Sequence, residues 1–450
     1  MKTEKITVNE LFSGIGAQVS ALERLGIPRE IKHTSDIDHN AVLSYASIHC
    51  GLTEELINTY TEYPTREEMA RQLTEINFGY DFQKSKPYNW YRFVNSKSKE
   101  LEKYWLANKL SKNLGDISKL EYLDYADFWT YSFPCTDISV AGKQEGIKHG
   151  KTRSGLLYEV QRLLERANKM LALPKYLMLE NVKNLVGKKF KPQFDEWVAW
   201  LDELGYNTYW KVLNAKDYGV PQNRERVFAI SIRKDIDNGK FEFPQPFDNG
   251  VRLKDVLEDN VDEKYYLSED IQNRLILTDE TLTKNIIGTT KPEYRSIGQR
   301  DLVYSENSIM GTLVATDYKQ PKQILETNRC VKVGDLNYYP YETSNRIYSK
   351  EGISPTLTTM QGGNTEPKIA DPIAAVIEPD VKSFRVRKLT PKECYRLMGF
   401  ADEQFDRSQA FNSDSQLYKQ AGNSIVVDVL YYIFEKLFEV DTGTRKETEC

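Results

Sequence analysis

The chain alternates between short apolar runs and segments whose apolar residues recur every three or four positions. Short runs predict β-strands, and the longer period predicts amphipathic helices. Strands that alternate with helices are typical of a mostly parallel sheet covered on both faces, so we expect a doubly wound, Rossmann-like α/β fold. The predicted strands are residues 5–12, 31–36, 128–133, 176–181, 206–213 and 226–232.

Two segments interrupt this alternation. Residues 51–113 are polar, helix-prone and tyrosine-rich, and we interpret them as an inserted, solvated helical decoration. Residues from about 235 to 383 are rich in Tyr, Thr, Asn, Gly and Pro and predict short strands and turns. Within them, "VYSENSIMGTL" (303–313) and "IYSKEGISPTL" (347–357) are similar. Two copies are too few for a solenoid and predict two similar hairpins.

Helical patterning returns after residue 384. Thr390 and Glu393 have the spacing of a capping box, and Pro391 stands at the first helical position. A final helix is expected at 425–439. The predicted organisation is a first domain at 1–232, a smaller strand-rich domain at 233–383 and a C-terminal segment at 384–450, whose last helix returns to the first domain.

Composition excludes several classes of protein. No apolar stretch reaches the roughly 18 to 20 residues of a membrane span. The N-terminus lacks the apolar core of a secretion signal, so we expect a cytoplasmic protein without a membrane partner. The five cysteines form no CxxC pair and there are only four histidines, which argues against a disulfide framework and a metal site. A net charge of −5 neither indicates nor excludes nucleic acid.

The first motif is "FSGIG" at 12–16, where a strand turns into a helix. Glycines there allow a ligand to approach the backbone, and Asp36 at the end of the next strand suits a ribose hydroxyl pair. Val19 stands where a dinucleotide fingerprint requires its third glycine. The pattern therefore favours a nucleoside cofactor without a pyrophosphate. The alternative is an ordinary tight turn.

Cys135 follows Pro134 at the end of a predicted parallel strand. Open α/β sheets place their sites at that edge, and the glycine-containing loop at 136–155 could close over it. Most cysteines are inert buried thiols, which is the alternative here.

Charged side chains mark two further strand ends. Glu180 lies near the end of the apolar strand "YLMLEN" and is suited to act as an acid or a hydrogen-bond anchor. Arg224 and Arg226, two residues apart at a strand start, are predicted to share one face and to bind phosphate or carbonyl oxygens. The alternative for Glu180 is a charge at the N-terminus of the next helix. The alternative for the two arginines is a solvated edge of the sheet.

These motifs occur in a specific order: "FSGIG", Asp36, "GDIS", "FPCTDIS", "LENV", "QNRER", then "RKLTPKECYRLMGF" and "AGNSIVVDVL". In that order they resemble the DNA (cytosine-5)-methyltransferase family of bacterial and phage modification enzymes. The resemblance covers roughly residues 5–45, 114–232 and 346–435. It implies a methyltransferase fold with a target-recognition domain at 233–383.

The resemblance also implies roles for the residues. Cys135 would attack carbon 6 of cytosine, Glu180 would bind ring nitrogen 3 and the amino group, and Arg226 would hold the ring carbonyl. Arg224 would support Cys135 and the flipped nucleotide. The cofactor would be S-adenosylmethionine, with Asp36 on the ribose. The cofactor residues would be Phe12, Ser13, Gly14, Ile15, Gly16, Asp36, Ile37, Asp116, Ile117, Phe133, Pro134, Asn423 and Ser424.

The implied substrate is a specific double-stranded DNA sequence with its target base flipped out. Arg346 is the best candidate for a base contact, because arginine to guanine is the commonest one. The expected DNA-binding residues are Ser139, Lys143, Gln144, Arg346, Thr356, Leu357, Gly362 and Gly363. We expect a monomer that requires no physical contact with a cognate restriction endonuclease.

Other functions stay open from the sequence. An RNA (tRNA) cytosine-5 methyltransferase would use the same chemistry. A DNA-binding regulator of the same fold would need a separate binding domain, and only about five residues precede the first strand. A nicotinamide dehydrogenase fits the first 40 residues alone.

Overall fold

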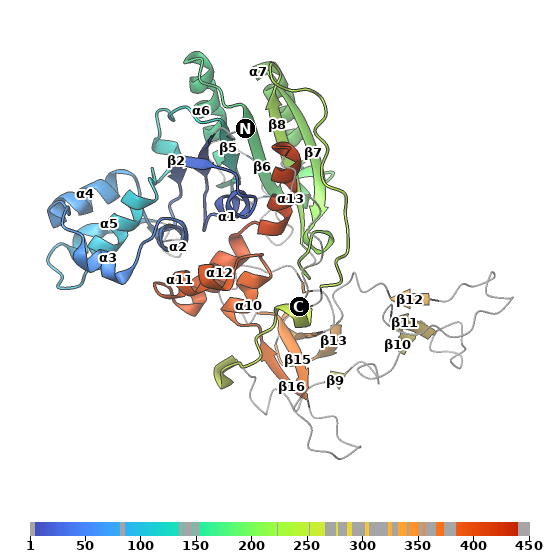
Figure 1. The fold of residues 1–450 in the computed structure, drawn as a ribbon. Coiled ribbons are helices and arrows are strands. Elements are labelled where there is room, and N and C mark those ends of the chain that lie inside the picture. The colour runs from blue at the N-terminus through green and yellow to red at the C-terminus, as the bar shows by residue number, and fades with distance from the viewer. Residues whose placement is uncertain are drawn as a thin grey trace.

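A computed structural model gives the fold of the chain (Figure 1). It describes residues 5–81, 86–134, 138, 147, 153–222, 224–251, 253–265, 276–277, 286–289, 302–305, 323–325, 332–339, 342–350, 354–355, 366–372 and 384–439. Eight predicted site residues lie outside these ranges: Cys135, Ser139, Lys143, Gln144, Thr356, Leu357, Gly362 and Gly363.

A six-stranded sheet is the centre of the fold, with the order β2-β1-β5-β6-β8-β7. The first four of these strands are mutually parallel, whereas β8 runs antiparallel to both of its neighbours. The expected mostly parallel α/β sheet is confirmed, with strand ends within two residues of prediction. The strands are β1 (Ile6–Leu11), β2 (Arg29–Ser35), β5 (Phe128–Tyr131), β6 (Tyr176–Val182), β7 (Tyr206–Asn214) and β8 (Glu225–Arg233).

Helices cover both faces of the sheet (Figure 1). Phe128 and Met178 face one core with α1 (Ala17–Arg24) and α13 (Val427–Leu437). Trp129 and Leu179 face a second core with α6 (Leu157–Lys169) and α7 (Lys191–Leu204). Adjacent residues of one strand thus point to opposite cores, as the two-residue period of a strand requires. The final helix α13 lies against α1, where Arg24 pairs with Asp428 at 2.8 Å.

The interpretation of residues 51–113 as a solvated decoration is wrong. Together with α2 (His39–His49), this segment forms a third hydrophobic core around Trp90, which is fully buried. Buried aliphatic and aromatic side chains such as Leu73, Leu101 and Trp105 supply that core, and the polar average composition of the segment did not reveal them. Its elements are α3 (Glu54–Thr59), α4 (Arg66–Glu75), β3 (Tyr80–Asp81), β4 (Lys86–Pro87) and α5 (Glu100–Leu110).

The strand-rich region contains two small sheets, of order β10-β11-β12 and β16-β15-β14-β13-β9. The repeated tyrosines Tyr304 and Tyr348 lie in β11 and β14. Each of these strands pairs antiparallel with the strand before it and parallel with the strand after it. The elements are β9 (Ile276–Leu277), β10 (Ile286–Thr289), β11 (Leu302–Ser305), β12 (Gln323–Leu325), β13 (Lys332–Asp335), α9 (Glu342–Asn345), β14 (Arg346–Ser349), β15 (Lys368–Pro372) and β16 (Phe384–Lys388).

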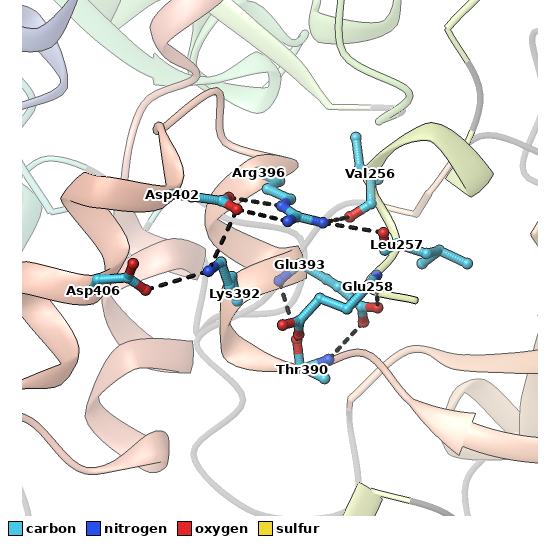
Figure 2. A network of polar contacts seen from close by, with 9 residues as sticks. All are labelled: Val256, Leu257, Glu258, Thr390, Lys392, Glu393, Arg396, Asp402 and Asp406. Atoms are coloured by element: carbon cyan, nitrogen blue, oxygen red, sulfur yellow. Dashed lines mark hydrogen bonds and ion pairs between the residues drawn. The ribbon is translucent and has the colours of Figure 1, made fainter. Parts of the chain in front are cut away.

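A polar network joins the two ends of this region (Figure 2). The predicted capping box of α10 (Pro391–Arg396) is present, and the buried Glu393 carboxylate also accepts from the Glu258 N–H at 2.9 Å. Arg396 donates to the Val256 and Leu257 carbonyls. The chain entering the strand-rich region is therefore tied to the helix that follows it. Helices α11 (Asp402–Gln409) and α12 (Asp414–Asn423) come next.

Candidate active site

Several predicted site residues among those that the structure describes lie at one edge of the main sheet because of its strand order. Parallel β2, β1, β5 and β6 are adjacent and point their carboxyl ends to that edge. Antiparallel β8 brings its amino end there, so Arg226 lies opposite Val182. Open α/β sheets form their binding crevices outside the carboxyl ends of the strands.

The "FSGIG" loop is held tightly between β1 and α1. The Phe12 N–H donates to the Ser35 carbonyl at 2.7 Å, and the Gly14 N–H donates to Asp36 Oδ2 at 2.9 Å. Gly16 caps α1 with φ of 80°, and a Cβ there would lie 2.5 Å from His49 Nε2. Both facts require glycine at this position. The His49 ring in turn contacts the Ile15 carbonyl oxygen at 3.0 Å.

Asp36 follows β2 directly beside this loop. Its Oδ1 accepts from the Asp38 N–H at 2.8 Å. Burial, and next the Asp38 carboxylate, raise the pKa of Asp36 to about 6, although backbone N–H groups and Lys419 oppose the rise. Lys419 of α12 pairs with Asp38 at 2.6 Å. Sequence reasoning missed Lys419, which lies four residues before the predicted Asn423.

Asp116 begins the short 3-10 turn Ile117–Lys119. Its Oδ1 accepts from the Ser118 N–H, and its Oδ2 accepts from the Asn77 amide at 2.9 Å. Ile117 is buried in the second core. The Ile37 carbonyl accepts from the Gly79 N–H at 3.0 Å. The loop at 76–79, which sequence reasoning did not select, thus contacts the predicted cofactor residues Ile37 and Asp116.

Glu180 and Arg226 form an ion pair at this edge. Arg226 Nε lies 3.3 Å from Glu180 Oε1, and their side chains are 17% and 10% exposed. Burial raises the pKa of Glu180, and the nearby Arg226 and Arg224 guanidinium groups oppose that rise. A carboxyl group in such a place can retain a proton and donate it in a hydrogen bond.

The turn at Phe133 and Pro134 is fixed from two sides. The Asn181 amide donates to the Phe133 carbonyl at 3.0 Å, and the Ser154 hydroxyl donates to the Pro134 carbonyl at 2.7 Å. Both side chains are buried. Sequence reasoning missed them as positioning residues, although Asn181 stands next to Glu180 in "LEN". Together they fix the backbone just after β5.

Arg224 does not share a strand face with Arg226, because β8 begins at Glu225. Its buried guanidinium donates to the carbonyls of Gly422 and Ser424, at 3.0 and 2.8 Å. Ser424 is buried beside it and Asn423 is exposed. The predicted arginine pair therefore has two separate sets of partners.

Arg346 is half-buried and begins β14, where its register partner is Asp335 of β13. An isolated bridge between Gln222 and Ser354 connects this region to the main sheet. The Gln222 amide also donates to the Leu397 carbonyl at 2.7 Å. The bridge to Ser354 therefore places part of the strand-rich region next to the chain segment just before β8.

The residues at this edge suit a nucleoside cofactor. Nothing lies within 4 Å of the place where a side chain on Gly14 would begin. The Ser13 hydroxyl is buried and has no hydrogen-bond partner among the described residues. Asp36 offers a carboxylate beside them. Across the described ranges, no cluster of three His, Cys, Asp or Glu side chains could hold a metal ion.

Comparisons with known proteins agree with these features. A family model of the C-5 cytosine-specific DNA methylase matches residues 82–439. The Type II methyltransferase M2.ScrFI of Lactococcus lactis subsp. cremoris is 36% identical over 441 residues, covering 96% of this chain and 99% of the relative. The orphan methyltransferase M.SssI of Spiroplasma monobiae is 32% identical, covering 97% and 98%.

A solved structure shows the same fold at low identity. The S. pombe Dnmt2 methyltransferase matches with a TM-score of 0.53 and 17% identity, over 97% of this chain and 99% of that one. Within the described part of the chain, no helix has the length and apolar character needed to cross a membrane.

Proposed function

The chain belongs to the C-5 cytosine-specific DNA methylase family, and we propose that Cys135, Glu180 and Arg226 form its reaction centre. The enzyme transfers a methyl group from S-adenosylmethionine to carbon 5 of cytosine in DNA. The observation that carries the residue assignment is the largely buried Glu180–Arg226 pair at the end of β6, where the neighbouring Asn181 amide holds the Phe133 carbonyl.

Cys135 acts as the nucleophile. Carbon 5 of cytosine is too electron-poor to accept a methyl group unaided. Addition of the Cys135 thiolate to carbon 6 makes an enamine whose carbon 5 is electron-rich, which is covalent catalysis. S-Adenosylmethionine, when bound, supplies an electrophilic methyl group. A base then removes the proton from carbon 5, and the thiolate leaves carbon 6.

The described residues just before Cys135 in the sequence support this role. Tyr131 of β5 pairs with Leu179 of β6, so residues shortly after each lie at the same edge. Glu180 comes one residue after Leu179. The fixed carbonyls of Phe133 and Pro134 direct the chain from β5 toward that same edge.

Glu180 and Arg226 stabilise the ring while charge develops on it. A protonated Glu180 donates to ring nitrogen 3, and its second oxygen accepts from the amino group. Its raised pKa favours this protonated form. Arg226 holds the ring carbonyl oxygen. Preorganised donors in a site with little water stabilise developing charge strongly.

Residues at the ends of β1 and β2 would hold the cofactor. Asp36 accepts from the ribose hydroxyls, and Ser13 and the glycines of the loop leave room for the rest of the molecule. Asp116 accepts from the adenine amino group and Ile37 packs on its face. The pocket is completed by Phe12, Ile15, Gly16, Ile117, Phe133, Pro134, Asn423 and Ser424.

We propose that the strand-rich region selects a specific sequence in double-stranded DNA and that the target base is flipped into the site. The contacts at Gln222 and Ser354 support a fixed position for that region. We also propose that the enzyme acts as a monomer and needs no physical contact with a restriction endonuclease. The cytoplasm is the proposed compartment, since bacterial and phage DNA is found there.

The test is a covalent trap. A duplex with 5-fluorocytosine lacks the removable proton at carbon 5 and should hold the wild-type enzyme as an adduct when S-adenosylmethionine is present. Cys135→Ser should form none, because an alcohol does not ionise near neutral pH as a thiol can. Cys50→Ser is the matched control and should react normally, since burial raises the pKa of that thiol to about 12.

Bisulfite sequencing of DNA from cells that express the protein identifies the methylated sequence. An adduct that forms equally with Cys135→Ser would remove this residue as the nucleophile. Methylation of tRNA with no methylation of duplex DNA would favour the RNA enzyme. DNA binding without methylation of either would favour a regulator.

A further inference from the structure

The loop that follows α4 separates the two segments predicted to hold adenine. The Asp116 N–H donates to the Ile76 carbonyl at 2.9 Å, and the Gly79 N–H donates to the Ile37 carbonyl at 3.0 Å. The loop thus bonds to the backbone on both sides of the proposed adenine subsite. It belongs to the 51–113 segment, for which the sequence indicated no role.

Asn77 extends from this loop to the Asp116 carboxylate. Its amide donates to Oδ2 at 2.9 Å, while the Ser118 N–H and hydroxyl donate to Oδ1 at 2.9 and 2.7 Å. Both oxygens have a donor, so the carboxylate plane cannot rotate freely. Each carboxylate oxygen can accept more than one hydrogen bond, and capacity remains for an amino group of a ligand.

The loop also has little freedom to move. Gly115 has φ of 72°, and a Cβ on it would lie 2.1 Å from the Ile76 carbonyl oxygen. Phe78 is buried in the third core, and the Trp90 indole donates to its carbonyl. Asn77 itself adopts a left-handed conformation with φ of 51°. Asparagine tolerates that conformation better than most residues.

We propose that Asn77 is a positioning residue that orients Asp116 toward the adenine amino group of the cofactor. The core of the 51–113 segment holds the loop in place and thereby forms part of the wall of the adenine subsite. This inference rests on the proposed cofactor site.

The test measures binding of two non-reactive probes by calorimetry. S-Adenosylhomocysteine carries the adenine amino group, and S-inosylhomocysteine has an oxygen in its place. Wild type should prefer the adenosyl probe. Asn77→Asp keeps the shape and backbone preference of the residue but replaces the donor with a negative charge beside Asp116. It should bind the adenosyl probe at least about tenfold more weakly, the scale of one lost hydrogen bond to a charged group, and lose most of the preference.

Two further variants control for charge and for folding. Asn58→Asp adds the same charge to an exposed site of the same segment, where Asn58 contacts Lys99, and should leave both affinities unchanged. Asn77→Gly keeps the left-handed backbone available and should also reduce the preference. Circular dichroism checks that each variant is folded.

The outcomes separate this inference from the proposed function. If Asp116→Ala loses the adenosyl preference but Asn77→Asp and Asn77→Gly keep it, the positioning role is wrong and the cofactor site stands. An equal loss for both probes in the Asn77 variants also overturns it, because the loop would then only close the pocket. If Asp36→Ala and Asp116→Ala bind both probes as wild type does, the proposed cofactor site itself fails.

Discussion

Glu10 allows a quantitative test of the site's electrostatics. It lies in β1 just before the "FSGIG" loop and is fully buried. The Tyr45 hydroxyl of α2 donates to its Oε2. Burial raises the pKa of Glu10 from 4.5 to about 7, and the Tyr45 hydroxyl and the charge of Arg29 on β2 reduce the rise. The substitution Glu10→Gln removes the charge and keeps the shape.

The direction in which stability changes with pH follows from proton binding. The folded state binds the Glu10 proton more tightly than the unfolded chain does, so wild-type stability falls as pH rises from the unfolded to the folded pKa. The rise in the pKa of Glu10 from 4.5 to about 7 corresponds to a loss of about 3 kcal/mol in the free energy of unfolding, at roughly 1.4 kcal/mol per pKa unit. Most of that cost, about 2 to 3 kcal/mol, develops between about pH 5 and pH 8. The Gln variant should not show it.

Urea unfolding without cofactor, followed by circular dichroism at several pH values, measures the difference. The free energy of unfolding of Glu10→Gln minus that of wild type should grow with pH. The pH-independent cost of burying amide donors cancels from this trend. Glu30→Gln is the control. Lys32 and Lys5 lower the pKa of the half-buried Glu30 below 4.5, so its stability difference changes only at more acidic pH and should stay nearly constant from about pH 5 to pH 8. A difference for Glu10→Gln that stays constant from about pH 5 to pH 8 would refute the reasoning.

Three further predictions concern the site. Asp36→Ala should weaken S-adenosylhomocysteine binding by about 1–3 kcal/mol, and wild-type affinity should fall as pH drops below the Asp36 pKa of about 6. Lys419→Met should move this fall in cofactor affinity to higher pH in calorimetric titrations, because the lysine charge lowers the pKa of Asp36. An unchanged midpoint of the fall would exclude coupling between Lys419 and Asp36. Glu180→Gln should slow methylation about 10²- to 10⁴-fold with cofactor affinity unchanged. Arg346→Ala should relax one position of the recognised sequence by about 1–3 kcal/mol in a bisulfite-sequenced random library. A uniform loss across sequences would instead indicate a phosphate contact, and lower stability alone would indicate a brace for β14.

Local patterns were sufficient for much of the fold. The six strands of the main sheet were predicted within two residues, and the capping box at Thr390 and Glu393 is present. Both features depend on residues close in sequence. Segment 51–113 was misjudged because its core is built from scattered aliphatic and aromatic residues of several short elements, and these residues meet only after folding. An average over the segment could not detect that arrangement.

The sequence by itself determined the order of the motifs and, through it, which side chains stand at the ends of successive strands. Parallel strands bring such residues to one edge, so Asp36, the glycine loop and Glu180 could be grouped in advance. Only the tertiary structure decided the partners of these groups. Arg224 bonds to Ser424, 200 residues away, Lys419 pairs with Asp38, and Asn77 extends to Asp116. Such contacts depend on how separate elements pack, because the hydrogen-bonding capacity of a side chain does not specify which distant group will meet it.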